Sequence, residues 1–285
     1  MKADHKIELM CRVLKVSRSG FYDWRSRFVD RLKKSEYESR LAEEVLAVYK
    51  ESRGTYGHRS ILEELMKKDI VSSRREVLKA MRNKGLKATP QRSKPYPRLT
   101  DIPEHKTCKN RLRRQFSAKQ PNRYWVGDIT YLWTGEGWLY LATVLDLYSR
   151  MIVGWSISDK PDTQLAINAL KEALANRPYR KWRLMFHSDQ GCQYTSNEMR
   201  QFLRDKSILQ SMSRRGQCWD NAAMESFFGT LKQETGLGKW PLDSAEETKF
   251  AIFDWIECWY NVKRRHSKLG YCSPAHFEAN KGRVA

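Results

Sequence analysis

The chain has 285 residues, 40% of them hydrophobic, with 10 Trp and 13 Tyr, so it is long enough for two domains with sizeable cores. Its formal net charge of +20 favours a polyanionic partner such as nucleic acid. There is no membrane-length apolar run, no signal-peptide pattern and no CxxC pair among the six cysteines. These features argue against a membrane-spanning protein, a secreted protein and a structural zinc site, and they predict a cytoplasmic protein with reduced thiols.

The positive charge is concentrated in the first part of the chain. Residues 1–120 carry 31 Lys and Arg against 15 Asp and Glu, whereas residues 121–285 carry 22 against 18. This division predicts that DNA binding and chemistry are shared between an N-terminal and a C-terminal region.

Residues 1–88 are predicted to form a basic, all-helical, DNA-binding region. Apolar residues at helical spacing on both sides of a Ser/Gly turn predict a helix-turn-helix at 7–28, with an ordinary helical hairpin as the alternative. A further amphipathic helix is predicted at 35–52. The last helix of the region starts at a serine and ends at Gly85. We expect Arg74 and Arg75 on its positive face to contact DNA phosphates, although such faces are also found merely solvated.

Residues 89–121 are rich in proline and charge and are predicted to be an extended basic linker. Beyond them, apolar and β-branched runs predict strands at 123–132, 137–147 and 151–158, followed by alternating helices and strands. The last helix of this alternation is expected at about 220–234. This order predicts an α/β fold: a ribonuclease-H-like mixed-sheet core at 122–238, followed by a C-terminal helical extension at 239–285.

Three acids lie in these predicted elements. Asp128 interrupts an apolar strand, Asp189 follows an apolar strand and precedes a Gln-Gly turn, and Glu225 lies inside the helix at 220–234. Alone, each has an ordinary explanation as an exposed strand, turn or helix residue. Together, carboxylates from separate elements can hold divalent metal ions for phosphodiester chemistry. Two further acids compete with them: Asp146 is interpreted as a strand-end acid and Asp220 as a helix N-cap.

The segments around the three acids are more specific than their spacing. HSDQGCQYTS, CWDNAAMESFFGTLK and YNVKRRHSKLGYCSPAHFE resemble the integrase core encoded by the second reading frame of the third family of bacterial insertion sequences. The resemblance extends forward to CRVLKVSRSGFYDW and therefore covers nearly the whole chain. With 35 residues between the last two, the acids match the DDE signature of retroviral integrases and bacterial transposases.

The resemblance implies a DDE transposase that holds two Mg²⁺ ions, or Mn²⁺ in their place, on Asp128, Asp189 and Glu225. Such an enzyme cleaves phosphodiester bonds at element ends and transfers the strands to target DNA. The expected partners are double-stranded DNA of the terminal repeats and target, and a second copy of the chain in a synaptic complex that is at least dimeric. The product of an upstream reading frame, fused or in trans, is a further expected partner, and the expected location is the bacterial nucleoid.

Several other residues are expected to support this site. Lys232 follows Glu225 by two helical turns on roughly the same face, and in related enzymes a basic residue here contacts DNA near the cleaved phosphate. A surface lysine is the alternative. His187 and the Gln190-Gly191 pair flank Asp189 and either orient it or serve packing and turn formation. A basic cluster is also expected to contact DNA, with a solvated face as the alternative: Arg264, Arg265, His266 and Lys268.

Two other functions are compatible with the sequence. A ribonuclease-H-like nuclease would cut DNA without joining strands, and a DNA-binding regulator would carry the core without its activity.

Overall fold

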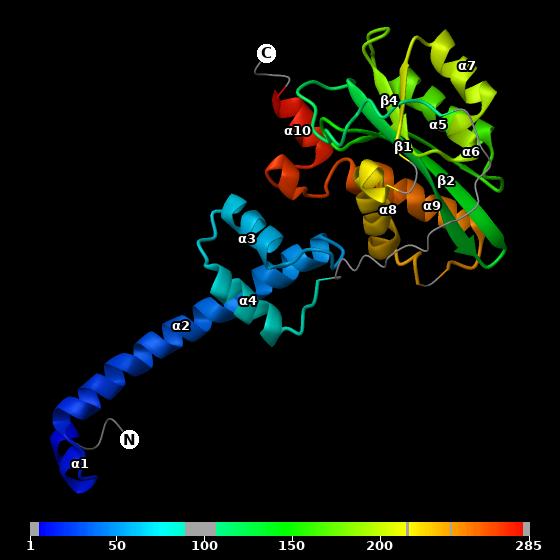
Figure 1. Ribbon diagram of the computed structural model, residues 1–285. Helices are drawn as coiled ribbons and strands as arrows, with labels where there is room; N and C mark the ends of the chain where they lie inside the picture. Colours follow the sequence, from blue (N-terminus) through cyan, green and yellow to red (C-terminus); the bar gives the residue numbers. More distant parts are fainter. Residues whose placement is uncertain (1–5, 89–106, 215–216, 240, 282–285) are drawn as a thin grey trace. The chain divides into compact units, whose positions relative to one another are not determined.

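The computed structural model describes residues 6–88, 107–214, 217–239 and 241–281, which belong to two compact units, 1–89 and 90–285. The first unit is all-helical (Figure 1) and consists of α1 (Ile7–Val13), α2 (Arg18–Glu51), α3 (His58–Lys67) and α4 (Arg74–Asn83). Its core is formed by the second half of α2 with α3 and α4, where Val45, Ile61 and Val77 are fully buried. Among the described helices, none combines the length and the apolar character that a bilayer crossing requires.

The second helix is longer than the sequence suggests. Instead of ending near residue 28 and restarting near residue 35, α2 runs unbroken for 34 residues, so the prediction of two separate helices is wrong. The segment between them, VDRLKK, contains no Gly or Pro that would break a helix. At the other end of the unit the prediction is confirmed: Ser73 and Glu76 form a capping box before α4, and Gly85 follows it at φ +65°.

The second unit contains the predicted mixed sheet (Figure 1). The strand order is β3-β2-β1-β4-β5, with β1–β2 and β2–β3 antiparallel and β1–β4 and β4–β5 parallel. The strands are β1 (Tyr124–Thr134), β2 (Gly137–Asp146), β3 (Ile152–Ser158), β4 (Met185–Ser188) and β5 (Leu209–Met212). The helices are α5 (Thr163–Asn176), α6 (Cys192–Thr195), α7 (Asn197–Asp205), α8 (Ala222–Glu234), α9 (Ala245–Phe253) and α10 (Pro274–Lys281).

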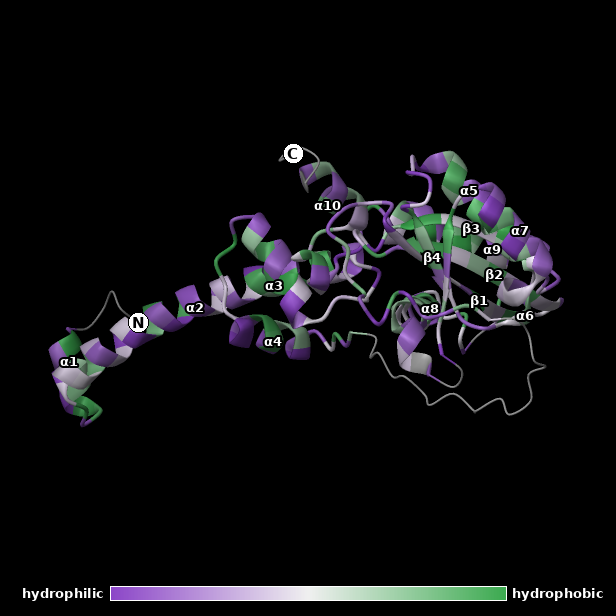
Figure 2. Cartoon of the chain, turned by 45° about the horizontal axis from the view of Figure 1, so that its top comes forward, coloured by the Kyte–Doolittle hydropathy of each residue, from purple (hydrophilic) through white to green (hydrophobic). Residues whose placement is uncertain are grey.

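Helices cover both faces of this sheet, as a ribonuclease-H-like fold requires. On one face α5 packs against Trp125, Val144 and Val153, and hydrophobic residues concentrate on these strands (Figure 2). Gly154 allows the close approach of α5, because a Cβ there would lie 2.4 Å from the Ala169 carbonyl oxygen. The other face carries α8, whose Phe227 packs on aromatic residues from the π-helical segment Asp254–Tyr260 that continues α9. The C-terminal extension therefore belongs to the same compact unit as the sheet.

The predicted linker divides into two parts. Residues 89–106 lie outside the described residues. Residues 107–121 pack on the sheet unit instead of forming an extended linker: Leu112 is buried, and the Arg111 backbone N–H donates to the Ser211 hydroxyl at 2.9 Å. A single buried leucine in a charged, proline-rich segment has no periodicity that would reveal it.

Candidate active site

Asp128 lies in the middle of β1, and two hydrogen bonds fix its carboxylate. Oδ1 accepts from the Ile129 backbone N–H at 2.8 Å, and Oδ2 accepts from the Asn221 side-chain amide at 3.0 Å. Asn221 is the last residue of the 3-10 turn Cys218–Asn221 that leads into α8. The start of α8 is therefore linked directly to the central strand.

Asp189 immediately follows β4, the parallel neighbour of β1. The register pairs Val126 with His187, and Asp128 and Asp189 each lie two residues beyond this pair. The Gly191 backbone N–H donates to Asp189 Oδ1 at 2.9 Å. A Cβ at Gly191 would lie only 3.0 Å from that oxygen, so glycine keeps the carboxylate in place without crowding it.

The two aspartates affect each other electrostatically. Burial and the neighbouring Asp189 raise the pKa of Asp128 well above its ordinary value; Glu225 adds to this increase and Lys232 opposes it. Burial also raises the pKa of Asp189. Two carboxylates that share one partly buried place repel each other when both are charged, which is the electrostatic environment that a bound cation relieves.

Glu225 occupies the first turn of α8 and is half-buried, and burial raises its pKa. The influence of Glu225 on the pKa of Asp128 places it near the aspartate pair. As the side chains stand, no three His, Cys, Asp or Glu residues in the described part of the chain are close enough to hold a metal ion together. The geometry is therefore a pair of aspartates with a flanking glutamate.

Lys232 lies on the same helix as Glu225, near its C-terminal end. It is half-buried, and its pKa is lowered by burial and raised by Asp128. A positive charge thus accompanies the acids, in agreement with the helical spacing from Glu225.

His187 and Asp220 have structural roles. The buried His187 ring bridges the Ser211 hydroxyl at 2.8 Å and the Asp220 backbone carbonyl at 3.0 Å, so it joins β4 to β5 and to the start of α8. Asp220 is not a helix N-cap, as the sequence suggested. Its buried carboxylate accepts from Asn110, Arg114 and Arg214. Asn110 and Arg114 belong to the packed segment before the sheet and Arg214 to the loop after β5, so these contacts replace local capping.

Two members of the predicted basic cluster face inward, which does not fit direct contact with DNA. Arg264 forms an ion pair with Glu234 at 2.9 Å and its side chain is 16% exposed. His266 packs edge-on against Tyr260 with its Nε2 atom buried, and burial together with Arg264 and Arg150 lowers its pKa to about 3. By contrast, Lys268 is exposed.

In the first unit, Arg74 and Arg75 are exposed on the first turn of α4, where the Arg74 guanidinium donates to the His58 ring at 3.0 Å.

Sequence reasoning missed three side chains that surround the aspartates. Asn221 is at the N-cap position of α8, but its side chain makes no capping hydrogen bond and instead donates to Asp128. Tyr194 is buried and Tyr131 is 53% exposed, and the charges of Asp128 and Asp189 raise the pKa of both, after the larger effect of burial. All three residues stand close to the acids in sequence, which is the one signal that could have marked them.

The fold and the acids together define a class: an integrase-like polynucleotidyl transferase of the DDE type. Residues 118–218 match the integrase core domain family, 206–274 match a second integrase core family, and 36–94 match the HTH-like domain family. The HTH-like match thus comprises the second half of α2 with α3 and α4. Residues 7–28, where two helices around a turn were predicted, contain α1, a turn and the start of α2, and their DNA-binding role stays a prediction. The catalytic core of HTLV-2 integrase in complex with magnesium has a TM-score of 0.43 and 17% identity, and the match covers 56% of this chain and 97% of that one.

The chain is also similar to named transposases. It is 39% identical to transposase InsF for insertion sequence IS3fB of Escherichia coli (strain K12), over 97% of this chain and 95% of that protein. It is 37% identical to the insertion element IS600 uncharacterized 31 kDa protein of Shigella sonnei, over 94% of this chain and 97% of that protein. The chain therefore belongs to the transposases of IS3-type insertion sequences, which confirms the resemblance and the function it implied.

Proposed function

We propose that this transposase cuts and joins double-stranded DNA with two Mg²⁺ ions held by Asp128, Asp189 and Glu225, and that Mn²⁺ can replace Mg²⁺. The observation that carries the proposal is that Asp128 on β1 and Asp189, directly after the parallel strand β4, lie close enough for the charge of Asp189 to raise the pKa of Asp128. Carboxylate oxygens are the ligands that Mg²⁺ and Mn²⁺ prefer, and the repulsion between the pair fits a cation between them. Glu225 would complete the ligand set by a small movement of the α8 side chain toward the pair.

The residues around the acids have roles that follow from their contacts. The Ile129 backbone N–H and the Asn221 amide each hold one oxygen of Asp128, and the Gly191 backbone N–H holds one oxygen of Asp189. Each carboxylate keeps further lone pairs with which it could bind a cation. When bound, the metal ions supply activation of the attacking oxygen and stabilisation of the leaving oxygen. Lys232 would neutralise part of the charge of the substrate phosphate.

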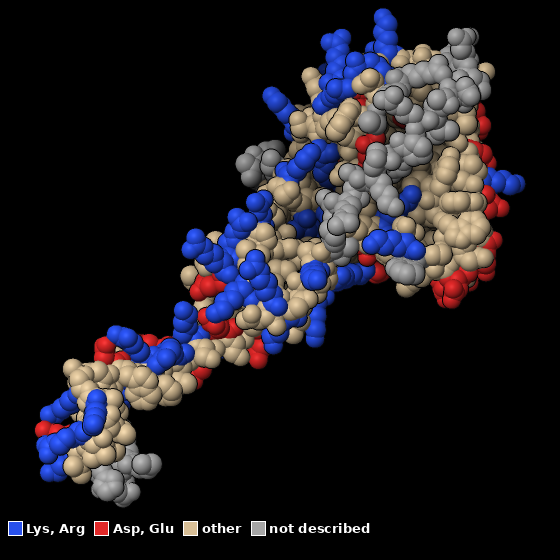
Figure 3. Space-filling model, turned by 60° about the horizontal axis from the view of Figure 1, so that its bottom comes forward, with Lys and Arg blue, Asp and Glu red and all other residues tan. Residues whose placement is uncertain are grey.

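DNA binding is proposed for the first unit as well. Lys and Arg side chains cover much of its visible surface (Figure 3), and Arg74 and Arg75 lie exposed at the start of α4 within the HTH-like region. We expect them to contact backbone phosphates of the terminal repeats. Joining two element ends would require at least a dimer, and the product of an upstream reading frame would supply further end recognition.

The test is strand transfer from a pre-cleaved oligonucleotide end into target DNA, with Mg²⁺, Mn²⁺ or EDTA. We expect joined product with either metal and none in EDTA. Glu225→Gln should lower the rate by more than about 100-fold, since even the outer partners of metal ligands contribute 10- to 100-fold. Glu246→Gln is the matched control, because it changes an exposed glutamate in the first turn of α9.

Two results would contradict the proposal. Metal-dependent nicking without joining would indicate a nuclease. DNA binding without any reaction, even with the upstream product added in trans, would indicate a regulator.

A further inference from the structure

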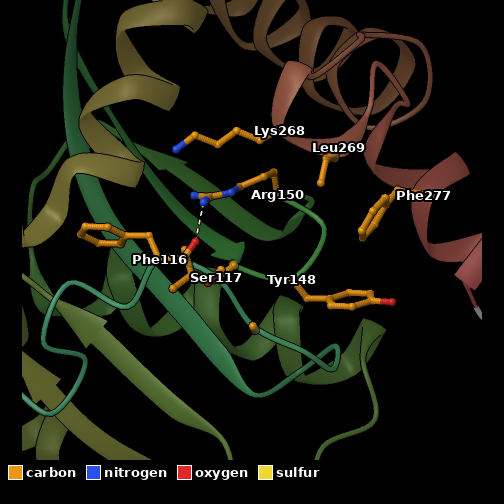
Figure 4. Close-up of a pocket in the computed structure, with 9 residues that line it drawn as sticks. Phe116, Ser117, Tyr148, Arg150, Lys268, Leu269 and Phe277 are labelled. Atoms are coloured by element: carbon orange, nitrogen blue, oxygen red, sulfur yellow. Dashed lines mark hydrogen bonds between the residues drawn. The ribbon is translucent and has the colours of Figure 1, made fainter.

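A second charged site lies apart from the acids, in a pocket of about 500 Å³ (Figure 4). The turn between β2 and β3 contributes Tyr148 and Arg150, and the C-terminal extension contributes Lys268, Leu269 and Phe277. A third side is formed by the packed segment 116–118. The volume is in the range of sites for small organic groups and far exceeds that of a bare ion.

The two cations of this pocket are Arg150 and Lys268. In Figure 4 the Arg150 and Lys268 side chains run in the same direction, with their charged ends toward Phe116. The Arg150 guanidinium donates one hydrogen bond, to the Phe116 backbone carbonyl, although it carries five N–H groups. Among the described residues, no carboxylate lies within ion-pair distance of Arg150 or Lys268.

Two other arginines of the sheet unit do meet carboxylates. Arg177 pairs with Glu278 at 2.6 Å, and Arg264 pairs with Glu234. Arg150 is half-buried, and burial lowers its pKa. A partly desolvated cation beside another cation is costly unless an anion joins them.

The backbone of Arg150 is held in a conformation that aims this side chain. Its φ of +62° is in the left-handed region, which costs free energy for a residue with a Cβ. The Arg150 N–H donates to the Asp146 carbonyl at 2.8 Å, and the Arg150 carbonyl accepts from the Tyr260 hydroxyl at 2.9 Å. Glycine or asparagine would occupy this position with less strain, so an arginine here points to use of its guanidinium.

The pocket also has an aromatic wall. The rings of Tyr148 and Phe277 lie 5.3 Å apart and line the same pocket as the two cations. Cations that bind phosphate next to aromatic rings that contact a sugar or base are the combination found in nucleic-acid sites.

We propose that this pocket binds one nucleotide of the DNA substrate, with its phosphate between Arg150 and Lys268 and its sugar or base against Tyr148 and Phe277. The inference rests on the transposase function, since it requires DNA as the substrate. It adds a DNA contact outside both the acidic site and the HTH-like region.

The test measures affinity for a duplex oligonucleotide in EDTA over a range of salt concentrations, so its outcome does not depend on metal chemistry or strand transfer. Lys268→Gln and Arg150→Asn should each weaken binding by roughly 5- to 20-fold. The double variant should lower the slope of log affinity against log salt by about 0.9, the value for one phosphate, because both cations bind the same group. Lys171→Gln, an exposed lysine of α5, is the control for loss of one positive charge.

Arg150→Asn should keep the fold, because asparagine adopts the left-handed conformation readily, and thermal melting verifies this. If Arg150→Asn unfolds, the exposed Lys268→Gln and Lys268→Glu variants carry the test. A double variant, or a Lys268→Glu variant, that binds DNA like the Lys171→Gln control would overturn the proposal. The proposal would also be overturned if the double variant lost binding to a free nucleoside monophosphate while its affinity for DNA stayed unchanged, because the pocket would then serve a small molecule.

Discussion

Asp128 on β1 and Asp189 directly after β4 are half-buried carboxylates, and hydrogen-bond donors alone do not compensate their charge. The pKa of Asp128 is raised well above that of an unfolded aspartate, which is about 4, so the folded state holds a proton that the unfolded state has lost. The stability of the metal-free protein therefore falls as the pH rises from the pKa of an unfolded aspartate to the raised pKa of Asp128. At neutral pH the charged pair destabilises the fold until a cation binds.

We therefore expect Asp128→Asn to stabilise the metal-free protein at pH 7 while abolishing activity. The variant removes the charge repulsion with Asp189. It can also keep its hydrogen bond to Asn221: if the Asn221 amide rotates by about 180°, its Oδ1, which is now buried without a partner, accepts from the new amide N–H at position 128. A gain of about 1–2 kcal/mol would raise the melting temperature by roughly 2–8 °C. Thermal melting in EDTA and in Mg²⁺ measures this, and Mg²⁺ should stabilise only the wild type.

The control is Asp205→Asn, which changes an exposed acid at the end of α7 and should leave both melting curves unchanged. An Asp128→Asn protein that melts below the wild type in EDTA would contradict the electrostatic account.

At the scale of single residues, the sequence singles out Asp128, Asp189 and Glu225 because they stand in distinctive segments, and their role as metal ligands stays a prediction. The side chains that contact them could not be predicted. Arg264 could not be assigned, because Glu234, its partner, lies 30 residues away and nothing local indicates the pairing. The contact of Asn221 with Asp128 could not be predicted, because the two residues are 93 positions apart and only the fold brings them together.

Among the elements, α8 depends on Asp220 for its position. The Asp220 carboxylate is fully buried and binds Arg114 from the packed segment and Arg214 from the loop after β5. Chiefly the hydrogen bonds from Arg214 hold the pKa of Asp220 well below its usual range. Because Asn221 and Glu225 follow directly, this ion-pair cluster also positions the proposed metal ligands.

We expect Asp220→Asn to lower the free energy of unfolding at pH 7 by about 1–3 kcal/mol. A depressed carboxyl pKa contributes stability above the unfolded value of about 4, and this contribution is lost as pH falls through the acid range. Urea unfolding at pH 7 and pH 3 should therefore show a gap between wild type and variant that narrows at pH 3. An equal gap at both pH values would mean that the carboxylate charge has no part in the stabilisation.

The elements of the sheet could be predicted with near-correct bounds, because alternating apolar residues and short turns are local signals. The length of α2 could not, since the exposed Trp24 and Phe28 suggested a short amphipathic helix of its own. The segment between residues 28 and 35 contains no Gly or Pro, so the helix continues through it. The packing of residues 107–121 could not be predicted from the sequence either, because it depends on contacts with Ser211 and Asp220, about 100 residues away.

For the whole molecule, the division of the chain into a helical unit and a sheet unit agrees with the uneven charge of the sequence. Each unit has its own buried core, and the HTH-like match and the integrase core match fall on different units. The central claim is that the sheet unit performs the chemistry on metal ions that Asp128, Asp189 and Glu225 hold directly, within a full chain that binds DNA elsewhere.

The most direct measurement is metal-specific rescue of strand transfer by the full-length Glu225→Cys variant, with Glu225→Ala as its control. A thiolate is a softer ligand than a carboxylate and binds Mg²⁺ poorly. Direct ligation predicts that Glu225→Cys is inactive with Mg²⁺ and regains part of its activity with Mn²⁺, while Glu225→Ala stays inactive with both. Full activity of Glu225→Cys with Mg²⁺, or identical behaviour of the two variants with both metals, would contradict the assignment of Glu225 as a metal ligand.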